Sequence, residues 1–79
     1  MMQKWEYKFI DCFYHDEEWY PAYDNGQDIK NWKHGPNIAS YSNQLGEQGW
    51  ELVNLATSAA GTHVDHTEWF RLVFKRPKV

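Results

Sequence analysis

Cysteine is nearly absent from the chain, and this excludes the commonest covalent support of small domains. Cys12 is the only cysteine among 79 residues, so no disulfide can form within the chain. A lone thiol is typical of a reducing compartment, and the lack of any Asn-x-Ser/Thr glycosylation site agrees with that. We therefore expect a cytoplasmic protein.

Long apolar runs are missing as well. A membrane-spanning helix needs about 18 or more consecutive apolar residues, and no stretch of this sequence approaches that length. A secretory signal needs an apolar run of roughly 7–15 residues, but Lys4 and Glu6 interrupt the start of the chain. These absences predict a soluble protein with no membrane partner that stays where it is made.

Phosphate and nucleic-acid signatures are also lacking. The five glycines are isolated, so no glycine-rich phosphate loop is present. The net charge is −3, which disfavours binding to nucleic acid. Trp69, Arg71 and Lys75 alternate on one strand face as in sheet-based RNA readers, but the acidic total outweighs this signal. We expect no nucleic-acid partner.

The length limits the chain to a single domain, 1–79. A domain of this size buries only about 60–65% of its unfolded surface, so its core gives marginal stability. Disulfides, a metal or oligomerisation usually supplement such a core. Because disulfides are excluded, the sequence favours one of the other two.

Aromatic residues, by contrast, are abundant. The chain holds five Trp, five Tyr and four Phe, more large rings than a core of this size can bury completely. Charge is also unevenly placed, with carboxylates between residues 16 and 28 and cations between 71 and 78. We favour solvated segments as the explanation of the charges, and the alternative is a complementary contact between subunits.

The first strand is predicted over 5–14, because Trp5, Tyr7 and Phe9 alternate with polar residues. Residues 15–36 are predicted to be an irregular, aromatic-rich insert. They contain Pro21 and further turn-forming residues, which are typical of loops.

A helix is predicted over 37–48, followed by strands over 50–56 and 68–76. Asn37 suits the N-cap, and Gly49 suits a left-handed C-terminal cap that only glycine adopts without strain. The apolar stripe of this helix consists of Ile38, Tyr41 and Leu45.

The order of elements predicts an α+β fold of type β-α-β-β. A right-handed crossover places the third strand between the other two, giving a three-stranded antiparallel sheet of order 1-3-2 with the helix on one face. We expect that helix to pack on Trp5, Tyr7, Phe9, Phe70, Leu72 and Phe74. The insert or a second subunit must then cover the opposite face. The predicted interaction surface comprises Trp69, Val73, Val53, Leu55, Trp19, Tyr23 and Trp32.

Three blocks of the sequence resemble a family of short bacterial and phage proteins known only as a domain of unknown function. Residues 5–8 match its W-E-Y-K, residues 42–53 its L-N-x-L-G-x-x-G-W-E-L-V, and residues 74–77 its F-K-R-P. Ser42 replaces an apolar residue of that pattern, and the insert at 15–36 is longer than the family's. The resemblance implies the same fold and no activity, because no catalytic residues are assigned to the family.

A divalent metal is the alternative to self-association. His63, Asp65 and His66 lie in the connection between the last two strands, with His15 as a further candidate. Imidazole and carboxylate groups bind zinc, and a catalytic zinc site needs about three such ligands. An extended chain would point His66 away from the other two, so a polar loop tip is the favoured interpretation.

Other catalytic constellations are weaker. Cys12 and His15 have the chemistry of a nucleophile and a base, but a single cysteine at a strand end is more often a buried hydrophobe. Glu17 and Glu18 are adjacent and face apart, whereas acid–base pairs need opposed positions. The sequence therefore predicts a non-catalytic interaction module with no cofactor. We expect it to form a homo-oligomer, most simply a dimer, and a different protein is a further candidate partner. A metal-binding domain or metal-dependent enzyme that uses a divalent metal is the alternative.

Overall fold

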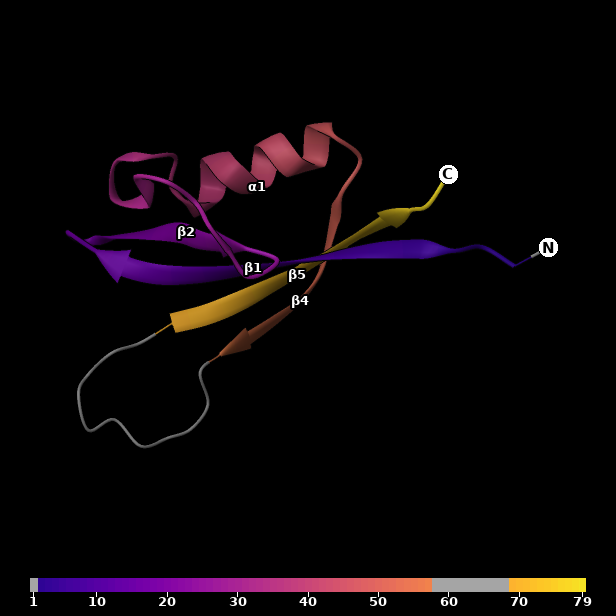
Figure 1. Cartoon of the computed structure of the whole chain (residues 1–79), viewed down its shortest axis with the longest axis horizontal. Coiled ribbons are helices and arrows are strands. Elements are labelled where there is room, and N and C mark those ends of the chain that lie inside the picture. The colour runs from indigo at the N-terminus through magenta and orange to yellow at the C-terminus, as the bar shows by residue number, and fades with distance from the viewer. Residues whose placement is uncertain (1, 58–68) are drawn as a thin grey trace.

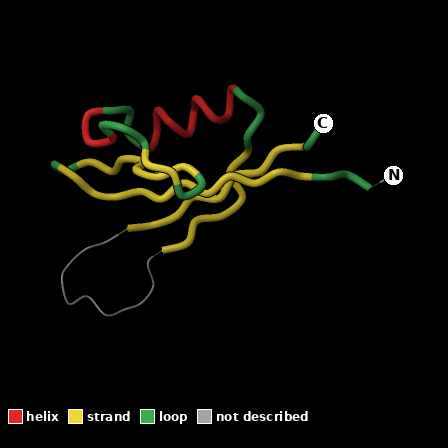
Figure 2. The backbone as a smooth tube through the Cα atoms, in the orientation of Figure 1, coloured by secondary structure: helices red, strands yellow, loops and turns green. Residues whose placement is uncertain are grey.

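The computed structural model of the chain describes residues 2–57 and 69–79. One helix lies over a long, twisted sheet, and both ends of the chain lie at the same end of that sheet (Figures 1 and 2). In chain order, the elements are β1 (Trp5–His15), β2 (Glu18–Asp24), β3 (Gln27–Asp28), the short 3-10 helix η1 (Trp32–His34), α1 (Ile38–Glu47), β4 (Glu51–Thr57) and β5 (Trp69–Pro77).

The described strands form one five-stranded antiparallel sheet in the order β3-β2-β1-β5-β4. The α+β class with an antiparallel sheet is therefore confirmed. The three-stranded sheet of order 1-3-2 is wrong, because part of the segment expected to be irregular forms β2 and β3.

A tight turn between β1 and β2 explains why the chain forms a strand where an irregular segment was predicted. Asp16 and Glu17 link β1 to β2, and both have positive φ, at 53° and 67°. Such turns favour Asn-Gly, so Asp16 and Glu17 are a weak signal for a hairpin. Pro21 also argued against a strand, but it lies opposite Cys12 where the β1–β2 register shifts, and proline is tolerated at such a bulge.

The covered face of β1 is not the expected one. Ile10 and Cys12 are fully buried under α1, whereas Trp5, Tyr7 and Phe9 point away from it and are exposed. The register decides this, because Ile10 pairs with Leu72, and residues directly opposite share a face. The core consists of Ile10, Cys12, Leu45, Trp50, Leu72 and Phe74.

Both ends of α1 follow the sequence prediction. The side chain of Asn37 accepts a 2.9 Å hydrogen bond from the Ser40 N–H, as an N-cap should. At the other end Gly49 has a φ of 93°, and the Trp50 N–H donates to the Leu45 carbonyl. This closure turns the chain into β4 and puts the Trp50 ring in the core beside Leu45.

Candidate functional site

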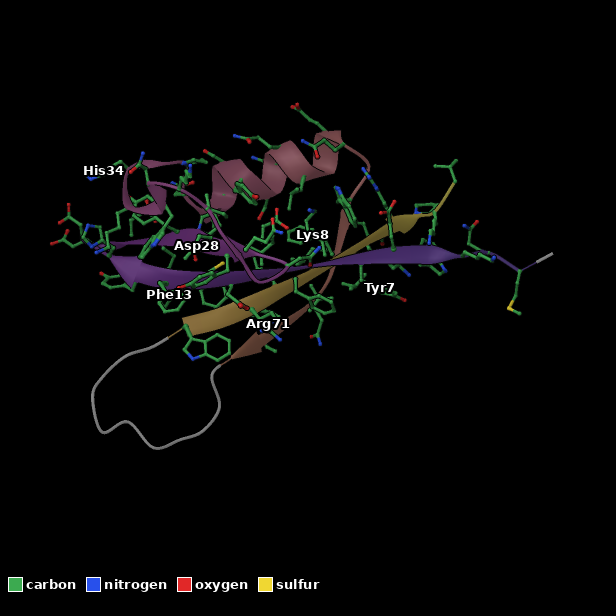
Figure 3. The ribbon with its side chains drawn as sticks, in the orientation of Figure 1. Tyr7, Lys8, Phe13, Asp28, His34 and Arg71 are labelled. Atoms are coloured by element: carbon green, nitrogen blue, oxygen red, sulfur yellow. The ribbon has the colours of Figure 1, made fainter. Side chains whose placement is uncertain are left out.

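The face of the sheet away from α1, here called the open face, carries a row of exposed rings. Trp5, Tyr7 and Phe9 are 37%, 51% and 42% exposed along β1, one of the inner strands. Figure 3 shows Tyr7 and Arg71 on this side of the sheet and Lys8 on the side of α1. By register, the neighbouring residues of β5 on the open face are Trp69, Arg71, Val73 and Lys75.

Cations of β5 lie against these rings. Lys75 Nζ is 4.1 Å from the centre of the Trp5 ring, and Arg71 Cζ is 5.8 Å from that of Phe9. Asp11 holds Arg71 through two hydrogen bonds of 2.6 and 3.2 Å, and these bonds with the carboxylate charge raise the pKa of Arg71 above its usual range. The open face thus presents apolar rings with cations beside them, and the Asp11 ion pair holds one of these cations, Arg71, in place.

The end of the open face near the β1–β2 turn is covered by further aromatic rings. Trp32, carried by η1, has its ring centre 5.9 Å from Phe13, 6.1 Å from His15 and 6.3 Å from Tyr20. Tyr23 packs edge-on against Phe13 at 5.8 Å. The Trp32 and Tyr23 rings therefore cover the part of the open face near the β1–β2 turn, whereas Trp5, Tyr7 and Phe9 stay exposed.

A shallow hollow marks the middle of the open face. Its volume is about 400 Å³, and it is bordered by the β2–β3 turn, whose Asn25 exchanges two 2.8 Å hydrogen bonds with the backbone of Phe9. An aromatic or aliphatic side chain of a partner would fit a hollow of this size. Its lining residues are Tyr7, Phe9, Asp11, Asn25, Gly26 and Arg71.

The predicted interaction residues do not form one patch. Trp69 and Val73 lie on the open face. Val53 is the residue left between the Leu52–Phe74 and Asn54–Val73 pairs, where the β4–β5 register shifts. Leu55 pairs with Leu72 and so faces the side of α1, although it is 51% exposed. Trp19 also lies on that side.

The Trp19 ring is 4.7 Å from that of Phe70 and packs against the core. Trp32 and Tyr23 lie at the covered end of the open face. The residues that sequence reasoning missed are Trp5, Tyr7 and Phe9. The signal that could have found them was the apolar pair Ile10 and Cys12 on the other side of the same strand.

The candidates for metal binding and catalysis gain no support from the geometry. His63, Asp65 and His66 lie outside the described residues, and among residues 2–57 and 69–79 no three His, Cys, Asp or Glu side chains gather in a possible metal site. Cys12 and His15 stand three residues apart in β1 and so face opposite sides. Burial and the nearby Asp11 raise the pKa of the Cys12 thiol to about 12, which keeps it protonated and unreactive.

A polar cluster on the side of α1 has a structural role. Asp24 pairs with Lys8 at 3.0 Å and accepts a 2.8 Å hydrogen bond from the Tyr41 hydroxyl. Burial and Asp24 raise the Tyr41 pKa well above its usual range. These contacts join α1 to β1 and β2 beside a cavity of about 410 Å³, and each of the three groups already has its partner.

Comparison of the chain with protein-family models, curated proteins and solved structures found no significant match. Among the described residues, no helix has the length and apolarity needed to cross a membrane. The candidate site therefore rests on the chemistry of the open face.

Proposed function

We propose that this protein is a non-catalytic module that self-associates through the open face of its sheet, most simply as a dimer. The observation that carries the proposal is the row of exposed rings, Trp5, Tyr7 and Phe9, on an inner strand. Contiguous apolar surface of this kind usually marks an interaction site, and aromatic residues and arginine are enriched where proteins bury each other.

The ion pair between Arg71 and Asp11 supports the same function. Burying a lone charge in an interface is costly, but Arg71 already has the Asp11 carboxylate as its partner. Rings held on a strand and beside bound cations also lose little conformational freedom on association. A second copy would thus gain apolar contact at the Trp5 end without leaving Arg71 unpaired.

Self-association would also add to the marginal stability of a domain this small. The core cluster formed by the described residues is small, and the free energy of association would add to the stability of each copy. A reducing compartment such as the cytoplasm suits the free, buried thiol of Cys12.

The test compares substitutions on the two sides of β1. Sedimentation equilibrium at micromolar concentrations should give a dimer for the wild type and a monomer for Tyr7→Ser/Phe9→Ser. Tyr14→Ser is the matched control, because Tyr14 is 54% exposed on the same strand, but its ring packs on Trp19 on the side of α1. A monomeric wild type would overturn the proposal, as would a Tyr7/Phe9 variant that keeps its native circular dichroism and still dimerises.

A further inference from the structure

The two edges of the sheet differ in length. Among the described strands, β3 at one edge has two residues, whereas β4 at the other edge has seven. Within residues 2–57 and 69–79, no strand pairs with the outer side of β4. An edge strand of this length presents backbone N–H and C=O groups to which another strand can bind.

The side chains of β4 also favour pairing. Leu52, Val53 and Leu55 are exposed, and Glu51 is the only charged residue of the strand. β4 contains neither lysine nor proline, which commonly protect the edge of a sheet. Short apolar strands of low charge pair readily with copies of themselves, so β4 needs another form of protection.

The backbone pattern places the Leu55 N–H on the outer side of β4. Both backbone groups of Phe9 bond to Asn25, so they point away from β5. Successive residues of a strand direct their backbone groups to opposite sides, so Ile10 bonds to Leu72 across the β1–β5 pair. Because Leu72 directs its N–H and C=O toward β1, its β4 partner Leu55 directs its own groups outward.

The side chain of Asn54 occupies this outward N–H. Its Oδ1 accepts a 2.8 Å hydrogen bond from the Leu55 N–H. The β4–β5 register also shifts between Leu52 and Asn54, and such a bulge disfavours pairing at an edge. A strand that arrived at β4 would therefore have to break the Asn54 bond before it could pair with Leu55.

We infer that the Asn54 side chain blocks the outer edge of β4 from pairing with β4 of a second copy. The occupant is β4 because the other edge strand, β3, has only two residues. Two β4 strands would pair antiparallel with Leu55 opposite Leu55, each N–H donating to the carbonyl of the other. The two Glu51 carboxylates would then lie at opposite ends of the pair. The inference goes beyond the proposed function, which uses the open face.

The test first removes association through the open face, so that the edge is measured alone. Tyr7→Ser/Phe9→Ser is the background, and its dissociation constant is measured by sedimentation over a range of concentrations. Adding Asn54→Ala should lower that constant about tenfold, because an incoming strand no longer has to break a hydrogen bond. Asn43→Ala, the same substitution at an exposed position of α1, is the matched control and should leave it unchanged.

A second substitution locates the contact. Proline at position 55 lacks the N–H that a second strand would bind, and an edge strand tolerates it where the N–H faces outward. Leu55→Pro, added to the Asn54→Ala chain, should return the dissociation constant to that of the background. Circular dichroism checks that each variant is folded.

Amide hydrogen exchange gives a readout that needs no association. In dilute protein, the Leu55 N–H should exchange faster in the Asn54→Ala chain than in the background, because its hydrogen bond is lost. The exchange rate at Ile10, in the interior of the sheet, should stay the same.

Each outcome decides the inference. Tighter association of the Asn54→Ala chain that Leu55→Pro abolishes supports it. An Asn54→Ala chain that associates no more tightly than its background would overturn it, as would unchanged exchange at Leu55 or association that persists in Leu55→Pro. A monomeric wild type would overturn the proposed function and leave this inference standing.

Discussion

Two tryptophans, one on each face of the sheet, differ in how far their side chains are exposed to solvent. Trp50 is 8% exposed under α1, and Trp5 is 37% exposed on the open face. Each has a cation over its ring, Arg76 at 4.2 Å from Trp50 and Lys75 at 4.1 Å from Trp5. The cation is therefore common to both faces, and the difference lies in what else covers the ring. Trp50 belongs to the fold, whereas Trp5 is available to a partner.

The largest expected effect comes from removing these two rings in turn. Trp50→Ala should lower the free energy of unfolding by about 3–5 kcal/mol, because it leaves a cavity among Leu45, Ile10 and Phe74. Trp5→Ala should cost the monomer less than about 1 kcal/mol and should weaken self-association instead. Urea unfolding of dilute protein measures the first effect, and sedimentation measures the second. Equal losses of stability would contradict the division into a covered and an open face.

The alternation of residues 5–9 does not by itself tell which face of β1 is covered. Alternation placed Trp5, Tyr7 and Phe9 on one side, which is correct, and the polar residues between them suggested that the other side faced water. Those polar residues are instead paired at the edge of the core, Lys8 with Asp24 and Glu6 with Arg76, each at 3.0 Å. Long charged side chains can lie along apolar surface in this way, so periodicity gives the two sides of a strand but not their environments.

The parts predicted well are those that depend on local chemistry. Asn37 begins α1 and Gly49 ends it because capping needs only neighbouring backbone groups. The number of strands was predicted wrongly because Asp16 and Glu17 are unusual residues for a two-residue hairpin turn. Of the candidate surface, Trp69 and Val73 lie on the open face, but nothing in the local pattern indicated that Trp19 packs on the core.

The second prediction concerns the turn that carries Trp50 under the helix. Gly49→Val should cost about 1–3 kcal/mol, because a β-branched residue is strained at a φ of 93°. An added Cβ would meet no atom within 4 Å there, so the cost comes from the backbone alone. Gly46→Ala, within α1 and also without a close neighbour, is the control and should raise stability by about 0.5–1 kcal/mol. Similar melting temperatures for both variants would refute the role given to Gly49.

The third prediction uses the Cys12 thiol, which is fully buried on the covered face. Its pKa rises from the ordinary 9.0 to about 12 on folding, so between these values the folded chain holds a proton that the unfolded chain releases. The contribution of this thiol to the free energy of unfolding is therefore fully present below pH 9 and is lost as the pH rises from 9 toward 12. The loss should be smaller in Cys12→Ala, measured by urea unfolding across that range. Rapid alkylation of the native thiol at pH 8 would show that this face is open after all.

The smallest expected effect concerns backbone strain in the β1–β2 turn. The β2–β3 turn uses Asn25 and Gly26, with φ of 51° and 84°, and these residues accept such angles readily. The β1–β2 turn places Glu17 at a φ of 67°, where glycine would be less strained. Glu17→Gly should therefore raise the free energy of unfolding of the monomer by about 0.4–1 kcal/mol.

Glu17 lies in the β1–β2 turn, away from the exposed rings of Trp5, Tyr7 and Phe9, so the same substitution should leave self-association unchanged. The expected result is a more stable monomer by urea unfolding of dilute protein, with the wild-type dissociation constant by sedimentation. Gly26→Ala is the reference for the turn geometry, and it should lower stability because alanine is strained at that φ. If Glu17→Gly left the stability of the monomer unchanged or lowered it, the positive φ at Glu17 would not be a source of strain.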